Sequence, residues 1–143
     1  MKKILLFLLL ICSSFIFAQD GIVLSQESAN EKGITPMWPR CDRSRQSPAK
    51  CFDNSLRNHI IRKFRYPQAA VSEGLEGTVN IEFIINKKGK VEVIEVTGGH
   101  RYLQQEAIRI IRAIPKMEPG KWGKKPIAIA YSVPITFNKP RTQ

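Results

Sequence analysis

The side chains in this sequence that could carry out acid–base chemistry or bind a metal are few and scattered. Glu82, Glu92 and Glu95 lie in two neighbouring apolar segments, where paired carboxylates could act as a general acid and a general base. Lysines flank these segments, and carboxylates in such a setting are typical of a solvent-facing hairpin. His59 and His100 are far apart and lack metal-site spacing. Because the chain also lacks an HExxH motif and a phosphate-binding loop, we expect no catalytic residue, metal site or cofactor.

Three cysteines raise the question of thiol chemistry. Cys12 lies in an apolar N-terminal run, whereas Cys41 and Cys51 lie in a polar and basic region. A thioredoxin-like redox pair would have CxxC spacing, which is absent. In an exported protein the two remaining cysteines enter an oxidising compartment, where a pair is expected to be bonded. We therefore predict a structural disulfide between Cys41 and Cys51.

The N-terminus has the order of a secretory signal peptide. Two lysines precede an almost entirely apolar stretch, residues 4–17, and Ala18 follows it. Residues 4–18 span about 22 Å as a helix, which is shorter than the hydrocarbon core of a bilayer at about 30 Å. We predict that residues 1–18 form a signal peptide, cleaved after Ala18, and that the protein is periplasmic. The alternatives are an uncleaved inner-membrane anchor and a lipoprotein lipidated at Cys12.

Length and composition are those of one ordinary globular domain, with 143 residues, 43% hydrophobic and 24% charged. Removal of residues 1–18 takes away two lysines and no acid, so the net charge falls from +11 to +9. A basic balance favours anionic partners, but an exported protein rarely meets nucleic acid. We expect no nucleic-acid partner and no small-molecule substrate, and the charge is typical of a solvated surface.

Residues 19–51 lack a sustained apolar period. Residues 19–36 are polar and predict a disordered leader. Residues 35–50 are rich in proline, lysine and arginine and predict an irregular basic loop, which Cys51 pins to the folded domain. Packing against the fold is the expected role of the large apolar side chains outside the regular pattern: Met37, Trp38, Tyr66 and Trp122.

Helical periodicity appears in three places within residues 52–139. Asp53 or Asn54 can cap the first helix, and Pro67 and Gly74 can begin and end a short second one. A third helix is predicted from Tyr102 until Pro115 stops it. The first and third helices are expected to bury the apolar residues that recur at helical spacing: Leu56, Ile60, Ile61 and Phe64 in the first, and Leu103, Ala107, Ile110, Ile111 and Ile114 in the third.

Three strands are predicted, over residues 79–85, 91–96 and 127–137. Alternation breaks in the second strand, and a bulge near Val93 would restore it. The third strand contains Pro134, which cannot donate to a ladder, so we place this strand at the sheet edge. The first is the most apolar and is expected at the centre. The predicted fold class is α+β, a three-stranded antiparallel sheet (β-β-α-β) with helices packed on one face.

Residues 52–139, taken as an ordered set, resemble the TonB C-terminal domain family, particularly its Bacteroidetes forms. The cysteines in "PMWPRC" and "CFDNSL" resemble an N-terminal extension of those forms. The resemblance rests on Tyr66-Pro67, Ala70, Gly74 and Gly77, then Val79, Ile81, Phe83, Gly89 and Val91, followed by Leu103, Ala107, Pro115, Pro119, the stretch 123–126, Val133-Pro134-Ile135 and Phe137. Glu106 stands where the family usually carries a small residue.

The resemblance implies a non-enzymatic module that binds short peptides of outer-membrane TonB-dependent transporters or other envelope proteins. The chain has only a short polar leader where TonB itself has a long Pro-rich spacer, which favours peptide recognition over direct energy transduction. The alternatives are a structural envelope protein that binds peptidoglycan or an anionic surface through its basic face, and an edge that closes a homodimer. We expect a partner strand to bind the edge formed by Ile127, Ala128, Ile129, Ala130, Tyr131, Ser132 and Val133.

Overall fold

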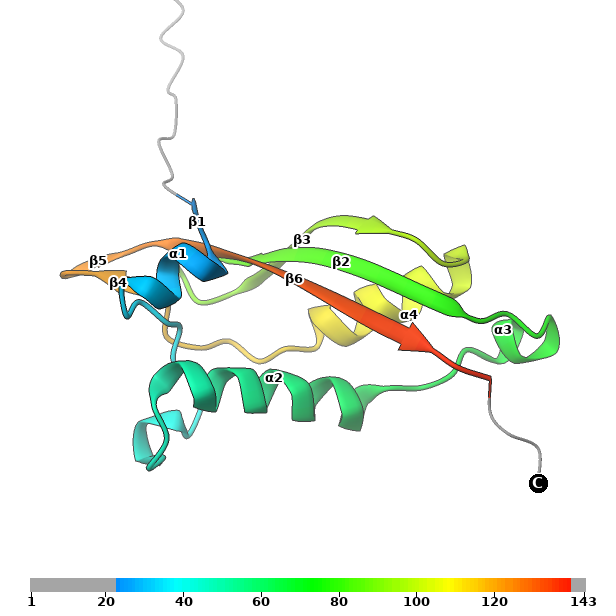
Figure 1. Cartoon of the computed structure of the whole chain (residues 1–143), viewed down its shortest axis with the longest axis horizontal. Helices are drawn as coiled ribbons and strands as arrows, with labels where there is room; N and C mark the ends of the chain where they lie inside the picture. The colour runs from blue at the N-terminus through cyan, green and yellow to red at the C-terminus, as the bar shows by residue number, and fades with distance from the viewer. Residues whose placement is uncertain (1–22, 140–143) are drawn as a thin grey trace, which may run out of the picture.

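A computed structural model describes residues 23–139 of the chain (Figure 1). The predicted signal peptide, residues 1–18, lies outside the described residues. Within them no helix combines the length and the apolar run needed to cross a membrane. The elements in chain order are β1 (Val23–Ser25), α1 (Gln26–Glu31), the short 3-10 helix η1 (Cys41–Arg43), α2 (Pro48–Lys63), α3 (Gln68–Ser72), β2 (Gly77–Ile85), β3 (Val91–Thr97), α4 (Arg101–Arg112), β4 (Lys121–Trp122), β5 (Lys125–Pro126) and β6 (Ala128–Phe137).

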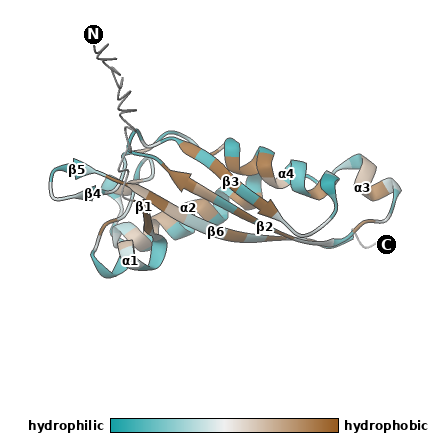
Figure 2. Ribbon diagram, turned by 90° about the horizontal axis from the view of Figure 1, so that it is seen from above, coloured by the Kyte–Doolittle hydropathy of each residue, from teal (hydrophilic) through white to brown (hydrophobic). Residues whose placement is uncertain are grey.

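The main sheet has the strand order β1-β6-β2-β3. β2 lies between β3 and β6 and pairs antiparallel with both, which confirms the predicted centre and its two flanks. Every second residue of β2 is fully buried, as the alternation predicted: Val79, Ile81, Phe83 and Ile85. Figure 2 shows apolar residues running along β2, β3 and β6. The α+β prediction is therefore confirmed, although the sheet has four strands because β1 adds one at the β6 edge.

The β2–β3 hairpin contains the predicted bulge. Phe83 pairs with Val93 and Glu82 pairs with Glu95, so Ile94 is the extra residue on β3. The bulge keeps the valines of β3 toward the helices and leaves Ile94 on the opposite face, where its side chain is 60% exposed. The sheet therefore has an apolar residue on the face that the large helices do not cover.

Helices α2 and α4 pack on one face of the sheet (Figure 1). In α4 the predicted apolar side chains are all buried, including Leu103 and Ile111. In α2 the prediction was only partly right, because Leu56 is buried but Ile61 is 63% exposed. Phe52 and His59 take the buried positions instead.

The start of α2 also differs from the prediction. The helix begins at Pro48, and the Ser47 side chain accepts a hydrogen bond from the Lys50 amide. Ser47 is thus the N-cap, and Pro48 occupies the first helical turn, where its missing N–H costs nothing. Asp53 and Asn54, the two predicted caps, both lie inside the helix. The short helix α3 does begin and end as predicted, after Pro67 and before Gly74 with φ +63°.

Residues 23–36, predicted to be a disordered leader, have a defined structure within the described residues. Ser25 caps α1 by accepting a hydrogen bond from the Ser28 amide. Ala29 and Ile34 are buried in the main core. A few widely spaced buried residues fix this segment to the core. Because they do not recur at a regular spacing, they produce no periodic pattern in the sequence.

Glu106 is buried and joins α4 to the end of α2. Its carboxylate accepts a hydrogen bond from the Arg65 amide at 2.9 Å and from two nitrogens of Arg109 at 2.6 and 2.8 Å. Arg109 also donates to the Lys63 carbonyl oxygen. The charge of Glu106 is thereby paired and hydrogen-bonded, as a buried carboxylate requires.

Candidate functional site

The seven residues predicted to bind a partner lie along β6 and the residue before it, with side chains pointing to two different faces. Ile127, Ile129 and Tyr131 are buried on the helix side, and Val133 is half-buried. The Tyr131 ring packs against Phe52 and Phe83 with centroid distances of 4.8 and 5.6 Å. These side chains belong to the core, so they cannot contact a partner directly.

Along β6, the N–H and C=O groups of successive residues point alternately toward β2 and toward the opposite side of the strand. Pro134 lies opposite Asn80 in an unbroken register with β2, and a proline has no N–H to donate to that ladder. Because the direction alternates along an antiparallel strand, Ser132 and Thr136 also point their N–H and C=O groups away from β2. The N–H and C=O groups of Ile129 point toward β2, so they belong to the central ladder and are not available to a partner.

β1 already occupies part of the outward edge. It pairs parallel with β6 through Val23–Ala128, Leu24–Ile129 and Ser25–Ala130. The expectation that residues 127–133 form a free edge therefore requires correction over residues 128–130. The sequence pattern missed β1 because it is three residues long. The short apolar pair Val23-Leu24 was the one available signal.

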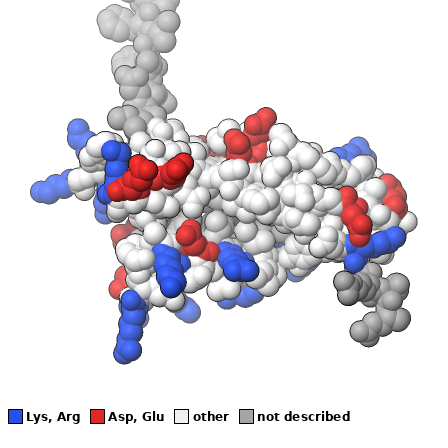
Figure 3. Space-filling model, in the orientation of Figure 1, with Lys and Arg blue, Asp and Glu red and all other residues white. Residues whose placement is uncertain are grey.

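The free part of the edge lies from Tyr131 to Phe137, beyond the end of β1. Ser132, Pro134 and Thr136 are exposed along it. Near the C-terminal end of β6, the hydroxyls of Thr136 and its β2 neighbour Thr78 are joined by a hydrogen bond of 3.0 Å. Figure 3 shows no lysine, arginine, aspartate or glutamate over the middle of this face of the molecule. An uncharged edge with outward main-chain groups can accept an extended segment without desolvating a charge.

A groove of about 770 Å³ lies on the sheet face beside this edge. Its apolar lining includes Val23 and Ile94, which are 50% and 60% exposed. Glu27 of α1 and Glu82 of β2 also line it, and no lysine or arginine does. Ala130 and Ser132 of β6 border the groove, so side chains of a strand added at the edge would lie next to it.

The acidic residues considered for acid–base chemistry lie on the solvent-facing side of the β2–β3 hairpin. Glu82 is opposite Glu95, and both are exposed, as is Glu92. Glu92 accepts a hydrogen bond from the Asn86 side chain in the neighbouring turn. Among residues 23–139 no group of three His, Cys, Asp or Glu side chains could hold a metal ion. The exposure of the three glutamates agrees with the solvent-facing hairpin expected from the sequence.

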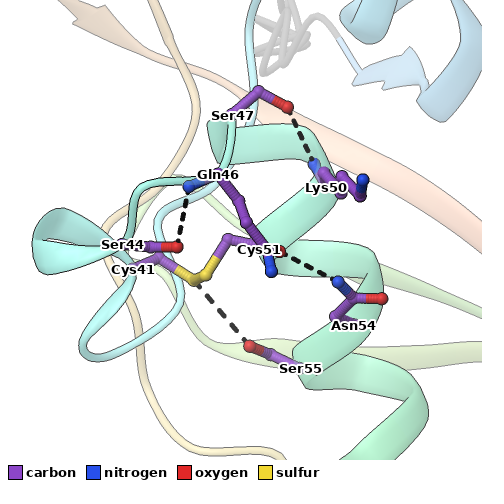
Figure 4. The surroundings of a disulfide bond; sticks show 8 residues. All are labelled: Cys41, Ser44, Gln46, Ser47, Lys50, Cys51, Asn54 and Ser55. Carbon is purple, nitrogen blue, oxygen red and sulfur yellow. Dashed lines mark hydrogen bonds between the residues drawn. A yellow bond between two sulfur atoms is a disulfide. The ribbon is translucent and has the colours of Figure 1, made fainter.

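A disulfide joins Cys41 to Cys51, as predicted, and ties the basic loop to α2 (Figure 4). The Ser55 hydroxyl lies 3.8 Å from the Cys41 sulfur, and Gln46 accepts a hydrogen bond from Asn54 at 2.9 Å. Trp38 in the same loop is buried against Phe52, with ring centroids 5.9 Å apart. The loop is thus held by the disulfide and by packing together.

Replacing Cys51 with serine is expected to lower the free energy of unfolding by about 2–3 kcal/mol, because closing a loop of this length restricts the unfolded chain. The sheet should persist, because Trp38 and Phe52 still pack without the bond. Denaturant unfolding of the variant and of reduced wild type measures the loss. Equal stability of the oxidised and reduced proteins would contradict it.

His59 is a buried polar residue that sequence analysis did not place. Its Nε2 lies 2.9 Å from the Ile110 carbonyl oxygen, so Nε2 carries the proton and donates. The ring also packs edge-on against Trp38 at 5.8 Å. Burial lowers the pKa of His59 below its ordinary value, which keeps the imidazole neutral.

A lowered pKa makes the fold sensitive to acid. Below about pH 6.5 the unfolded chain takes up a proton at His59 that the folded chain does not, so the free energy of unfolding falls as the pH drops. His59→Gln keeps a donor for Ile110 and removes this titration. We expect the stability of wild type to decrease more than that of His59→Gln between pH 7.5 and 5. Parallel stability curves from urea unfolding would refute this role of His59.

Two aromatic residues expected to pack have different environments. Tyr66 packs against Phe64 and Phe137 and donates its hydroxyl to the Leu75 carbonyl oxygen. Trp122 is 51% exposed on the β4–β5 hairpin, so packing was the wrong prediction for it. The lysine-rich, Pro/Gly-bounded sequence around Trp122 was the signal that it lies at the surface.

Sequence and structure comparisons give the family. The sequence model described as "Gram-negative bacterial TonB protein C-terminal" matches residues 62–138. The solution structure of a Helicobacter pylori TonB C-terminal domain (its residues 179–285) is 24% identical, with a TM-score of 0.50 over 64% of this chain and 83% of that one. A shorter form of the same domain (194–285) is 26% identical, with a TM-score of 0.43 over 61% and 92%.

No curated protein matches the sequence. The structure of the longer domain (179–285) supports the fold, and the family match covers more than half of the chain. TonB C-terminal domains are envelope modules of TonB-type energy transduction. The match includes β2, β3, α4 and all of β6, which are the elements that build the edge described above. This chain belongs to the family of Gram-negative bacterial TonB protein C-terminal domains.

Proposed function

We propose that this chain is a periplasmic binding module that adds a peptide of an outer-membrane TonB-dependent transporter to the edge of β6. The observation that supports it best is β1, which already pairs in parallel with the first part of that edge. A strand edge that accepts a segment of its own chain has the outward N–H and C=O groups needed for another segment. Such main-chain pairing is an established mode of peptide recognition.

The proposed site is the free edge from Tyr131 to Phe137, with Ser132 and Thr136 as outward donors. At about 3.3 Å per residue, this stretch matches a peptide of about seven residues. Pro134 contributes only a carbonyl oxygen, so a complementary peptide needs no acceptor opposite it. The proposed periplasmic location rests on the signal-peptide pattern of residues 1–18.

β1 and the peptide compete under this proposal. A peptide confined to residues 131–137 would bind beside β1, whereas a longer one would have to displace it from Ala128 to Ala130. β1 buries little, because Val23 is half exposed and the strand has three residues. Its displacement should therefore cost on the order of 1 kcal/mol, similar to one or two net hydrogen bonds.

The proposal is tested by titrating fluorescent peptides from the periplasmic N-terminal segments of TonB-dependent transporters of the same cell and measuring anisotropy. Sedimentation should first establish that the protein is monomeric at the concentrations used, because a free edge can also pair with a second copy. A peptide with proline at alternate positions is the control, since it cannot form a ladder. Saturable binding of the native peptide alone supports strand addition, and equal binding of the proline peptide argues against it.

Replacing Leu24 with proline should strengthen peptide binding. Leu24 lies between Ala128 and Ala130 in the parallel register, so its N–H faces β6 and proline there removes a hydrogen bond of β1. Loss of this competitor should lower the Kd by about threefold to tenfold for a peptide long enough to reach Ala128.

Val23→Pro is the matched control, because Val23 precedes Leu24 in β1 and its own N–H faces away from β6. It should change the Kd much less than Leu24→Pro in the same anisotropy titration. If Leu24→Pro leaves the Kd unchanged or weakens binding, β1 does not compete with the peptide.

A further inference from the structure

The β4–β5 hairpin extends from one end of the molecule and is exposed along its whole length (Figure 1). It consists of Lys121–Trp122 and Lys125–Pro126 joined by a two-residue turn. A Cβ added at Gly123 in that turn would meet no atom within 4 Å, so the tip is open to solvent. Trp122 lies next to the tip and is 51% exposed.

Four lysines surround Trp122. Lys121, Lys124 and Lys125 belong to the hairpin, and all three are exposed. The Nζ of Lys32, from the end of α1, lies 4.8 Å from the centre of the Trp122 ring. Residues 119–126 contain no acidic side chain. Figure 3 shows lysine and arginine side chains extending at this end of the molecule, with aspartate or glutamate side chains next to them. The Trp122 side chain therefore has a cation over its ring and is half exposed to solvent.

We propose that this hairpin binds the surface of a membrane that contains anionic phospholipid. Tryptophan favours the headgroup level of a bilayer, because its ring is apolar and its indole N–H still needs a polar partner. Lysines near an anionic leaflet are attracted to it, and their apolar stems can lie along the surface while the ammonium groups reach the phosphates. A protruding tip with one tryptophan and four lysines has both properties.

A glycan strand is a weaker candidate for the same surface. Recognition of sugar hydroxyls needs side chains that can both donate and accept hydrogen bonds, such as Asn or Gln. Residues 119–126 have no such side chain. Peptidoglycan is therefore treated as the competing outcome of the test.

Membrane binding at this end leaves the proposed peptide edge accessible. β6 begins next to the hairpin and runs toward the opposite end of the molecule, with residues 131–137 in its distal half (Figure 1). The two surfaces can be occupied together. The membrane proposal does not depend on peptide binding, because it rests on the hairpin alone.

The test uses the chain from Gln19 to Gln143, which contains every element described. Vesicles of phosphatidylcholine with 30% phosphatidylglycerol are compared with pure phosphatidylcholine vesicles by co-sedimentation and tryptophan fluorescence. The chain has one other tryptophan, Trp38, which is buried. A change in fluorescence emission therefore reports mainly on Trp122. We expect salt-sensitive binding to the anionic vesicles with a blue shift of the emission.

The variant K121Q/K124Q/K125Q should weaken vesicle binding by about a hundredfold, at about fivefold for each lysine. Its matched control is R62Q/K63Q/R65Q, which removes three exposed cations at the end of α2 far from the hairpin. The control should weaken binding less than about threefold. Trp122→Ala should reduce binding and abolish the blue shift.

Three results would overturn the proposal. They are equal loss of binding in the two triple variants, binding without any change in Trp122 emission, and binding to isolated sacculi but not to anionic vesicles. The first would indicate a general effect of net charge, and the third would assign the hairpin to peptidoglycan.

Discussion

Replacing Ser132 with proline is expected to weaken binding of a transporter peptide by at least about tenfold while leaving the fold intact. The N–H of Ser132 points away from β2, so its loss removes a donor to the peptide and none to the sheet. One net hydrogen bond is worth about 0.5–1.5 kcal/mol, and the proline ring adds steric interference with the incoming strand. Pro134 already occupies an equivalent position in β6, so the strand tolerates this residue.

Ser132→Ala is the matched control, because it changes the side chain and keeps the N–H. The two variants should have similar thermal unfolding midpoints, and only Ser132→Pro should lose affinity in an anisotropy titration. Equal affinities of Ser132→Pro and Ser132→Ala would show that the peptide does not pair with this edge.

Replacing Gly89 with alanine should have the largest effect on stability, a loss of about 3 kcal/mol or more. Gly89 has φ +75° in the β2–β3 turn, where an L-residue is strained by about 1–2 kcal/mol. A Cβ there would also lie 1.6 Å from the Met117 carbonyl oxygen, which is impossible without movement of the backbone. The Met117 amide donates to the Gly89 carbonyl at 3.0 Å, so the same movement would break this bond.

Gly33→Ala is a control that separates the strain of a positive φ from the steric clash of the added Cβ. Gly33 has a similar φ of +65°, but a Cβ there would meet no atom within 4 Å. This control should lose only about 1–2 kcal/mol in denaturant unfolding. If the two variants were equally stable, close packing of residue 117 on the turn would not contribute to the fold.

The strands that form the centre of the fold could be predicted because their patterns are long and regular. β2 has nine residues and β6 has ten, and in both strands buried side chains that face the helices largely alternate with more exposed ones. This two-residue period identifies the buried face directly. Pro134 then places β6 beside β2 with its other side open at that position, although β1 covers the first part of the same side. The bulge at Ile94 followed from the break in alternation alone.

The elements that differed from prediction depend on contacts between distant residues. Whether Ile61 or His59 faces the core depends on the rotation of α2 against α4, and His59 is accepted there because it reaches the Ile110 carbonyl. The helix start was misassigned because Asp53 is as good a capping type as Ser47. The Ser47-Pro48 pair is the stronger signal, because it joins a capping side chain to a proline at the first helical turn.

The sequence predicted which strand carries the candidate site, but not which part of its edge is free. Pro134 identified the edge, yet no local pattern indicates that β1 covers Ala128 to Ala130. The pairing joins residues about one hundred positions apart and involves a strand of three residues. The free edge is consequently displaced toward Phe137 relative to the predicted residues.

The most direct test of strand addition at β6 is amide-shift mapping of the isotope-labelled protein with an unlabelled transporter peptide, combined with isotope-filtered measurement of contacts between the two. Our account predicts shifts concentrated at residues 131–137, smaller shifts at residues 23–25 as β1 is displaced, and cross-strand contacts between peptide main-chain protons and those of Ser132 and Thr136. Shifts confined to the exposed sides of α2 and α4, with residues 131–137 unchanged, would contradict it.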